Sequence, residues 1–258
     1  MARNFFTVTE MAGTAVSQEQ IDRLVSRYFW AAHYCAGKDV VEAACGSGVG
    51  LGVLTSASRS LEAGDFSSGI LAVVRKNYGS RINLYEFDAQ EMPFKDCSKD
   101  VIILFEAIYY LPEPERFFRE CARVLRPRGQ VLISTANRDL WDFHPSPYSH
   151  RYFNMAELND HFGRIGFECE AFGFQPITEA PLRQRILRPV KRIASSAGLM
   201  PRTMHGKRWL KRIIFGNEVA IPAEIDASTG KYVPPTPIPC EIDRVHKVLY
   251  CAATRMAV

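Results

Sequence analysis

Two glycines and three acidic residues have the types and the spacing of a site for a nucleoside. Gly46 and Gly48 lie in a turn between a short apolar run and a predicted helix, and Glu42 comes just before this turn. Such a turn lets a ligand approach the backbone and offers it the free N–H groups of a helix N-terminus. Asp65 and Asp88 each end a later strand-like segment, where a carboxylate can accept the ribose hydroxyls or the adenine amine. These five residues predict a pocket for an adenosine.

The charge and the shape of the turn indicate what the adenosine carries. A dinucleotide-binding turn needs a third glycine where this chain has Leu51, and Glu42 would repel a pyrophosphate. A ligand with an amino group and a sulfonium would instead be attracted by that carboxylate. A nicotinamide-dependent oxidoreductase is therefore a disfavoured alternative. A non-catalytic relative that only binds the cofactor is another, although acids at three strand ends argue against it.

Strands that alternate with helices are predicted to position these residues. The strands are expected at Val40–Ala44, Ser60–Gly64, Arg81–Phe87, Asp100–Phe105, Gln130–Thr135, Phe167–Phe174 and Arg244–Arg255. This alternation predicts an α/β fold with a doubly wound, mostly parallel sheet that helices cover on both faces. Because parallel strands end at a common edge, Glu42, Asp65 and Asp88 are expected to lie together there.

Cap and breaker residues predict where the helices begin and end. The pattern that starts at Ser17 is a capping box, and the helix after it should end near Gly37. Ser67 and Asn154 are expected to cap two further helices. The helix that follows the fourth strand is expected to be broken by Pro127–Gly129, with a fifth strand after it.

Five ordered segments resemble the motifs of the class I S-adenosylmethionine-dependent methyltransferases. They are residues 42–48, 61–67, 87–94, 100–111 and 122–134. The resemblance covers about residues 38–135 and departs from the family pattern at Ala44 and Arg128, where glycine is usual. It implies S-adenosylmethionine as cofactor, a seven-stranded Rossmann-like sheet whose last strand is antiparallel, and an insertion between strands six and seven.

The resemblance also implies which residues hold the cofactor and how the chain divides. Arg27 is expected to pair with the cofactor's carboxylate, and Cys45 to act as a small filler in the turn. The predicted cofactor-binding set is Arg27, Glu42, Ala44, Cys45, Gly46, Gly48, Asp65, Phe66, Asp88, Ala89, Phe105 and Glu106. We expect a helical cap at 1–37, the methyltransferase core at 38–174 and 244–258, and an insertion covering the substrate at 175–243.

Methyl transfer from a sulfonium is an in-line displacement, so the enzyme must chiefly hold the acceptor against the methyl group. If the acceptor is a hydroxyl, a general base assists, and His150 is the first candidate and His144 the second. The alternative is that these histidines only pack their loop against the next helix. Glu106 and Tyr109, after the fourth strand, are expected beside the methyl end of the cofactor. No metal is required, and no clustered set of metal ligands is found in the sequence.

Composition favours a cytoplasmic protein. The chain has 258 residues, of which 47% are hydrophobic, enough for one sizeable core. It has no apolar run of the roughly 18 residues that span a bilayer, and its start does not resemble a signal peptide. The seven cysteines are scattered without a Cys-x-x-Cys pair, which favours free thiols.

A basic segment sets one region apart. Pro181–Gly216 has ten basic residues and no acidic one, whereas the whole chain has 32 basic and 28 acidic residues. Three interpretations remain: a solvated surface, a site for an anionic substrate such as a phosphorylated or lipid-linked sugar, or peripheral membrane contact through residues 183–215. No nucleic acid is expected as a partner, because interleaved stacking aromatics are missing. The expected acceptor is an oxygen of a small-molecule or sugar-containing metabolite, with nitrogen or carbon methylation as the alternative.

Overall fold

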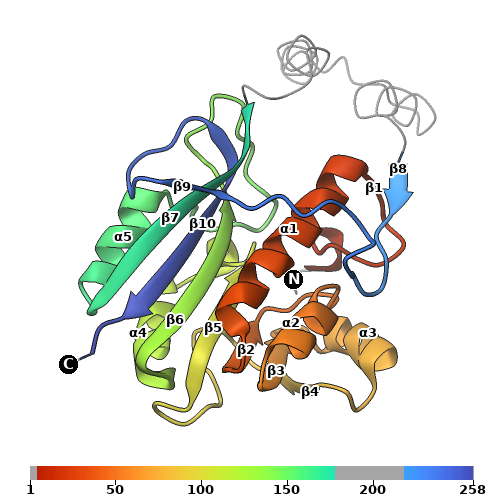
Figure 1. Cartoon of the computed structure of the whole chain (residues 1–258), viewed down its shortest axis with the longest axis horizontal. Helices are drawn as coiled ribbons and strands as arrows, with labels where there is room; N and C mark the ends of the chain where they lie inside the picture. Colours follow the sequence, from red (N-terminus) through yellow and green to blue (C-terminus); the bar gives the residue numbers. More distant parts are fainter. Residues whose placement is uncertain (1–4, 178–217, 258) are drawn as a thin grey trace.

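A twisted sheet with helices on both faces forms the centre of the molecule (Figure 1). The structure is a computed structural model and describes residues 5–177 and 218–257. Its helices are η1 (Phe5–Thr7), α1 (Gln18–Cys35), α2 (Leu51–Ala57), α3 (Ser68–Tyr78), η2 (Ile108–Tyr110), α4 (Pro114–Val124) and α5 (Met155–Gly163), where η marks a 3-10 helix. Its strands are β1 (Ala15–Ser17), β2 (Asp39–Ala43), β3 (Ser60–Asp65), β4 (Asn83–Glu86), β5 (Lys99–Phe105), β6 (Leu125–Ala136), β7 (Phe167–Pro176), β8 (Glu218–Ala220), β9 (Thr236–Ile238) and β10 (His246–Arg255).

The main sheet has the strand order β4-β3-β2-β5-β6-β10-β7-β9. Strands β2 to β6 pair in parallel, and β10 is antiparallel to both of its neighbours, β6 and β7. The predicted mostly parallel sheet with an antiparallel last strand is therefore confirmed, although the sheet has eight strands and not seven. The sequence pattern does not predict β9, a short edge strand that pairs with β7 at Ala171–Gly173.

Alternate residues of the central strands point into two separate cores. Val40 and Val101 face the core under α1, α2 and α3, whereas Val41 and Ile102 face the core under α4 and α5. All four are fully buried. Because side chains alternate along a strand, a strand that is apolar at every position needs cover on both faces. Figure 1 shows the two groups of helices on opposite sides of the sheet.

The helices begin where the cap residues predict. The Ser17 and Asn154 side chains accept hydrogen bonds from the backbone N–H groups three residues later, and each closes a full capping box. The predicted break at Pro127–Gly129 is different in the structure. There α4 already ends at Val124, and Pro127–Gly129 belongs to the first half of β6, where the pairing with β5 shifts register.

Segments distant in sequence cover the outer side of α1. Strand β8 pairs with β1, and Ile221 and Ile225 join the core under α1. The backbone N–H of Lys231 donates to Asp22 on the same helix. The basic segment, with its proposed membrane contact at 183–215, lies outside the described residues, and the division into cap, core and insertion stays a prediction. Within the described residues, no helix is long and apolar enough to span a bilayer.

Candidate active site

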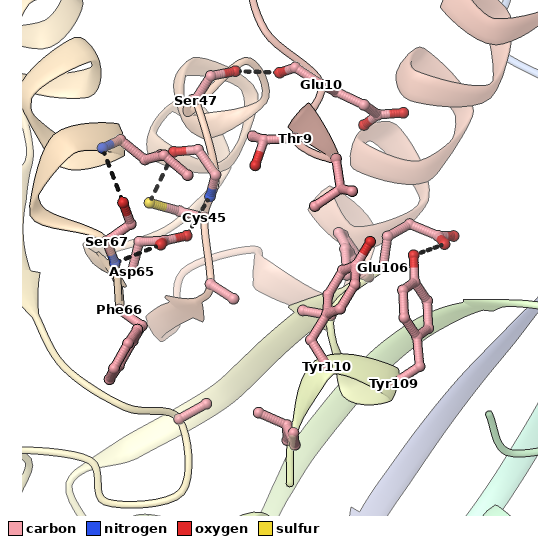
Figure 2. Close-up of a pocket in the computed structure, with 18 of the residues that line it drawn as sticks. Thr9, Glu10, Cys45, Ser47, Asp65, Phe66, Ser67, Glu106, Tyr109 and Tyr110 are labelled. Carbon is pink, nitrogen blue, oxygen red and sulfur yellow. Dashed lines mark hydrogen bonds between the residues drawn. The ribbon is translucent and has the colours of Figure 1, made fainter. Parts of the chain in front are cut away.

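A cleft of about 610 Å³ lies beyond the carboxyl ends of β2, β3 and β5. Ala44, Asp65 and Glu106, which end or directly follow these three strands, all line it. Figure 2 shows Asp65 and Phe66 on one side of the cleft, with Tyr109 and Tyr110 across from them. The volume lies within the range of sites for small ligands and cofactors.

The glycine turn brings the backbone to the surface of the cleft. Gly46 and Gly48 have φ values of +55° and +77°, which side-chain-bearing residues rarely adopt. A Cβ on Gly48 would also lie 2.9 Å from the side chains of Leu51 and Val74. Ala44 shares this left-handed conformation at φ 57°, which explains why glycine is usual at its position in the family.

Asp65 and Asp88 lie in the same half of the cleft, and the backbone orients both carboxylates. Asp65 accepts hydrogen bonds from the N–H groups of Gly46 at 3.0 Å and Ser67 at 2.9 Å. Burial raises the pKa of Asp65, and these N–H groups offset part of that rise. Asp88 accepts from the N–H of Gln90 at 2.8 Å. Two acceptors fixed in this way suit the hydroxyls and amine of an adenosine.

Glu42 lies beneath the turn and does not line the cleft. Its side chain is 1% exposed, and its Oε1 accepts a hydrogen bond from the Tyr28 hydroxyl at 2.8 Å. Its Oε2 has no hydrogen-bond partner among the described residues. Burial raises the pKa of Glu42 to about 8, so the carboxyl is largely neutral at neutral pH. The direct attraction of a sulfonium by Glu42 stays a prediction.

Glu106 and Tyr109 lie in the other half of the cleft, after β5. The Tyr109 hydroxyl donates to Glu106 Oε2 at 3.0 Å, whereas Glu106 Oε1 is buried and has no partner within the described residues. Burial raises the pKa of Glu106, and the nearby charge of Arg27 lowers it in part. Glu106 has a φ of 50°, a strained backbone of the kind that occurs at functional sites. Such a carboxyl can accept a proton inside the cleft.

The N-terminal segment covers the glycine turn, which the sequence does not predict. The Ser47 hydroxyl donates to the carbonyl oxygen of Glu10 at 2.5 Å, as Figure 2 shows. The carboxylate of Glu10 pairs with Arg27 at 2.5 Å, and the Arg27 side chain is only 4% exposed. Thr9 and Glu10 both line the cleft. Arg27, the expected partner of the cofactor's carboxylate, is thus already paired with a carboxylate of the chain itself.

The structure brings most of the predicted site residues together. The predicted residues that line the cleft are Arg27, Ala44, Cys45, Gly46, Asp65, Phe66, Asp88, Ala89, Phe105, Glu106 and Tyr109. Those outside its lining are Glu42, Gly48, His144 and His150. Both histidines are exposed, and the backbone N–H of His150 donates to the carbonyl oxygen of Tyr109 at 2.7 Å. Their assignment as general bases stays a prediction.

The architecture and the cleft together define a class of protein, and comparison with known proteins agrees. The family described as "Methyltransferase domain" matches residues 41–133. A protein of Mycolicibacterium smegmatis, named a probable S-adenosylmethionine-dependent methyltransferase, is 38% identical over 143 residues, 54% of this chain and 55% of its own length. Residues 41–133 therefore match the methyltransferase-domain family, and the fold is that of a class I S-adenosylmethionine-dependent methyltransferase. It spans about half the length of the curated relatives it matches.

Solved structures share the fold at low sequence identity. A SAM-dependent methyltransferase from Archaeoglobus fulgidus has a TM-score of 0.57 at 14% identity, over 93% of this chain and 95% of its own. A [4+2]-cyclase has a TM-score of 0.55, also at 14% identity, over 92% of this chain and 82% of its own. The fold therefore occurs with a different reaction, and the residues of the cleft must carry the functional argument.

The cleft residues fit S-adenosylmethionine as the methyl donor. Among the described residues that line the cleft, the cations are Arg23 and Arg27, both on α1. Neither belongs to the glycine turn or to the half of the cleft that holds Asp65 and Asp88. A pyrophosphate at the turn would meet these carboxylates without a neutralising side chain from the turn, whereas a cofactor without phosphates needs none.

Proposed function

We propose that the protein transfers the methyl group of S-adenosylmethionine to an oxygen of a small-molecule or sugar-containing acceptor by direct displacement. The observation that supports this best is that one cleft contains both oriented acceptors for an adenosine and a buried, proton-accepting carboxyl beyond them. When bound, the cofactor supplies an electrophilic methyl group on its sulfonium.

Residues on the glycine-turn side hold the cofactor in this proposal. Asp65 accepts the ribose hydroxyls and Asp88 the adenine amine, because backbone N–H groups already orient both carboxylates. Phe66 is 67% exposed beside them and offers a ring face to the adenine. Arg27 binds the cofactor's carboxylate after Glu10 has left it, since one guanidinium cannot pair fully with both.

Glu106 takes the acceptor's proton in this proposal. The group lines the cleft, its Oε1 has no partner within the described residues, and burial raises its pKa, which makes its carboxylate a stronger base. Tyr109 fixes the carboxyl through its hydroxyl. The loop histidines His144 and His150 are the second candidates, and they would have to approach the cleft from an exposed position.

Calorimetry with the intact chain tests the cofactor part of the proposal. S-adenosylmethionine and S-adenosylhomocysteine should bind with dissociation constants on the order of micromolar, and reduced nicotinamide dinucleotide should show no heat of binding. Binding of the dinucleotide without binding of S-adenosylmethionine would contradict the proposal. Release of S-adenosylhomocysteine with hydroxylated acceptors but not with their amine analogues would support oxygen methylation.

A further inference from the structure

Several buried polar atoms without partners lie in or next to one end of the cleft. Within the described part of the chain, they include Nε of Arg23, Nε of Arg27, Oε1 of Glu106 and the hydroxyl of Tyr250. The charges of Arg23 and Arg27 act on both Glu106 and Tyr250, so these four groups lie near one another. Buried polar groups are nearly always hydrogen-bonded in proteins, and a cluster of exceptions inside a cleft indicates a place for a polar ligand.

Arg23 differs from Arg27 in making no ion pair within the described residues. Arg27 is paired with Glu10 at 2.5 Å, whereas Arg23 makes no ion pair with any residue in 5–177 or 218–257. Both line the cleft, four residues apart and therefore on one face of α1. An unpaired guanidinium beside buried groups is a strong binding site for a carboxylate or phosphate, because it can donate two parallel hydrogen bonds.

The direction of α1 separates Arg23 from the cofactor's end of the cleft. A short connection joins α1 to β2, so the helix runs opposite to the strand, as Figure 1 shows. Arg23 is one helical turn, about 6 Å, farther from this connection than Arg27. It therefore lies farther out beyond the strand ends, whereas Arg27 contacts the segment over the glycine turn.

We propose that Arg23 binds an anionic oxygen of the methyl acceptor, a carboxylate or a phosphate, next to the hydroxyl that faces Glu106. The acceptor is then a hydroxy acid or a phosphorylated hydroxy compound. This inference rests on the proposed function and adds the chemical class of the substrate. It uses residues of the described cleft alone and does not depend on the basic segment.

Anion binding to the cofactor-saturated protein tests the inference. Acetate and inorganic phosphate, the smallest probes of the two classes, are titrated into protein saturated with S-adenosylhomocysteine, and the Nε–H signals of its arginines are followed by NMR. One of the two anions should shift the Arg23 signal saturably, and acetamide should not. Arg23→Gln should weaken this anion about tenfold or more, and Arg23→Lys less, because lysine keeps the charge without the planar donors.

A matched control excludes a general effect of charge. Arg119 is exposed on α4, away from the cleft, and Arg119→Gln should leave anion binding unchanged. Equal anion affinity in the wild-type protein and Arg23→Gln, or no binding of either probe, would overturn the inference. So would a loss of S-adenosylhomocysteine affinity in Arg23→Gln that matches the loss of anion affinity, because Arg23 would then bind the cofactor. Failure of the wild-type protein to bind S-adenosylhomocysteine would instead overturn the proposed function.

Discussion

The two halves of the cleft differ in how their polar groups are satisfied. In the half with the glycine turn, backbone N–H groups hold the carboxylates of Asp65 and Asp88 at 2.8 to 3.0 Å. In the half with Glu106, buried atoms of Arg23, Arg27 and Tyr250 have no partners among the described residues. The first half is organised before any ligand arrives, whereas in our proposal the second half gains its missing hydrogen bonds from a ligand.

This difference suggests that one half of the cleft binds the cofactor and the other half selects the acceptor. A preorganised half suits a ligand that is the same in every turnover, because its polar groups need no rearrangement to bind it. A half with unpaired charges discriminates strongly between acceptors, because an acceptor that leaves a buried group unpaired loses affinity.

Removal of Asp65 should have the largest effect. Asp65→Ala should weaken S-adenosylmethionine by about 100-fold or more, because two hydrogen bonds to a charged acceptor are lost and the Gly46 N–H loses its partner. Calorimetry measures the change, and circular dichroism checks that the variant folds. Unchanged affinity in a folded variant would show that Asp65 does not hold the ribose. The glycine-turn half of the cleft would then not be preorganised for the cofactor.

Glu106→Gln should affect the reaction instead of cofactor binding. We expect kcat for a hydroxyl acceptor to fall about 100-fold with little change in cofactor affinity, because the variant cannot accept a proton. Burial raises the pKa of Glu106. The wild-type rate should therefore increase as pH rises through that pKa, and the pH–rate profile of the variant should lack this increase. His150→Gln and His144→Gln are the matched variants. An equal loss in either one would identify a loop histidine as the base.

Glu42→Gln should change how stability depends on pH. The folded protein keeps the Glu42 proton up to about pH 8, against 4.5 for a free glutamic acid. Between pH 4.5 and about pH 8, the folded state therefore carries a proton on Glu42 that the unfolded state has lost. The contribution of Glu42 is complete below pH 4.5 and is lost as pH rises towards 8.

Denaturant unfolding measures this effect. Between pH 5 and pH 8 the wild-type protein should lose about 3 kcal/mol more of its unfolding free energy than Glu42→Gln, whose amide still accepts from Tyr28. Glu86→Gln, at an exposed position at the end of β4, should follow the wild-type curve. Parallel curves for Glu42→Gln and the wild-type protein would show that Glu42 is ionised beneath the turn.

Glu10→Gln should have the smallest effect, and it tests the boundary between the two halves. Loss of the Glu10 charge frees Arg27, so affinity for S-adenosylmethionine should rise about two- to fivefold. Glu91→Gln, which removes an acid paired with Arg116 on the exposed surface, is the control and should change nothing. A fall in affinity in Glu10→Gln would mean that the Glu10 carboxylate supports the cofactor site instead of competing for it.

The part of the site that could be predicted from the sequence is the part made of local motifs. Gly46, Asp65 and Asp88 each follow a strand that is recognisable from its own residues, and parallel strands must end at one edge. The sheet and its antiparallel last strand follow from the same alternation and from the family resemblance. The seventh strand is recognisable because β10 has a continuous apolar run from Val248 to Ala253, typical of a strand buried on both faces.

The remaining features depend on contacts between distant segments. Nothing in the pattern of residues 8–10 indicates that they cover the glycine turn, because three polar or small residues bury little surface by themselves. Glu10 pairs with Arg27, 17 residues later, and the Arg27 side chain is 4% exposed, although an arginine in an amphipathic helix is ordinarily solvated. β9 has three residues and includes Pro237, so its pairing with β7 has no signal in the sequence.

The fold class and the methyl donor could be inferred from the sequence alone, and the residues for the adenosine could be predicted from it. These depend on strand periodicity, on turn glycines and on acids at strand ends, all of which are local properties of the chain. The tertiary structure is needed to see that α1, the residue after β5 and β10 bring Arg23, Glu106 and Tyr250 near one another. Burial leaves polar atoms there without hydrogen-bond partners among the described residues, and burial is a property of the packed molecule alone.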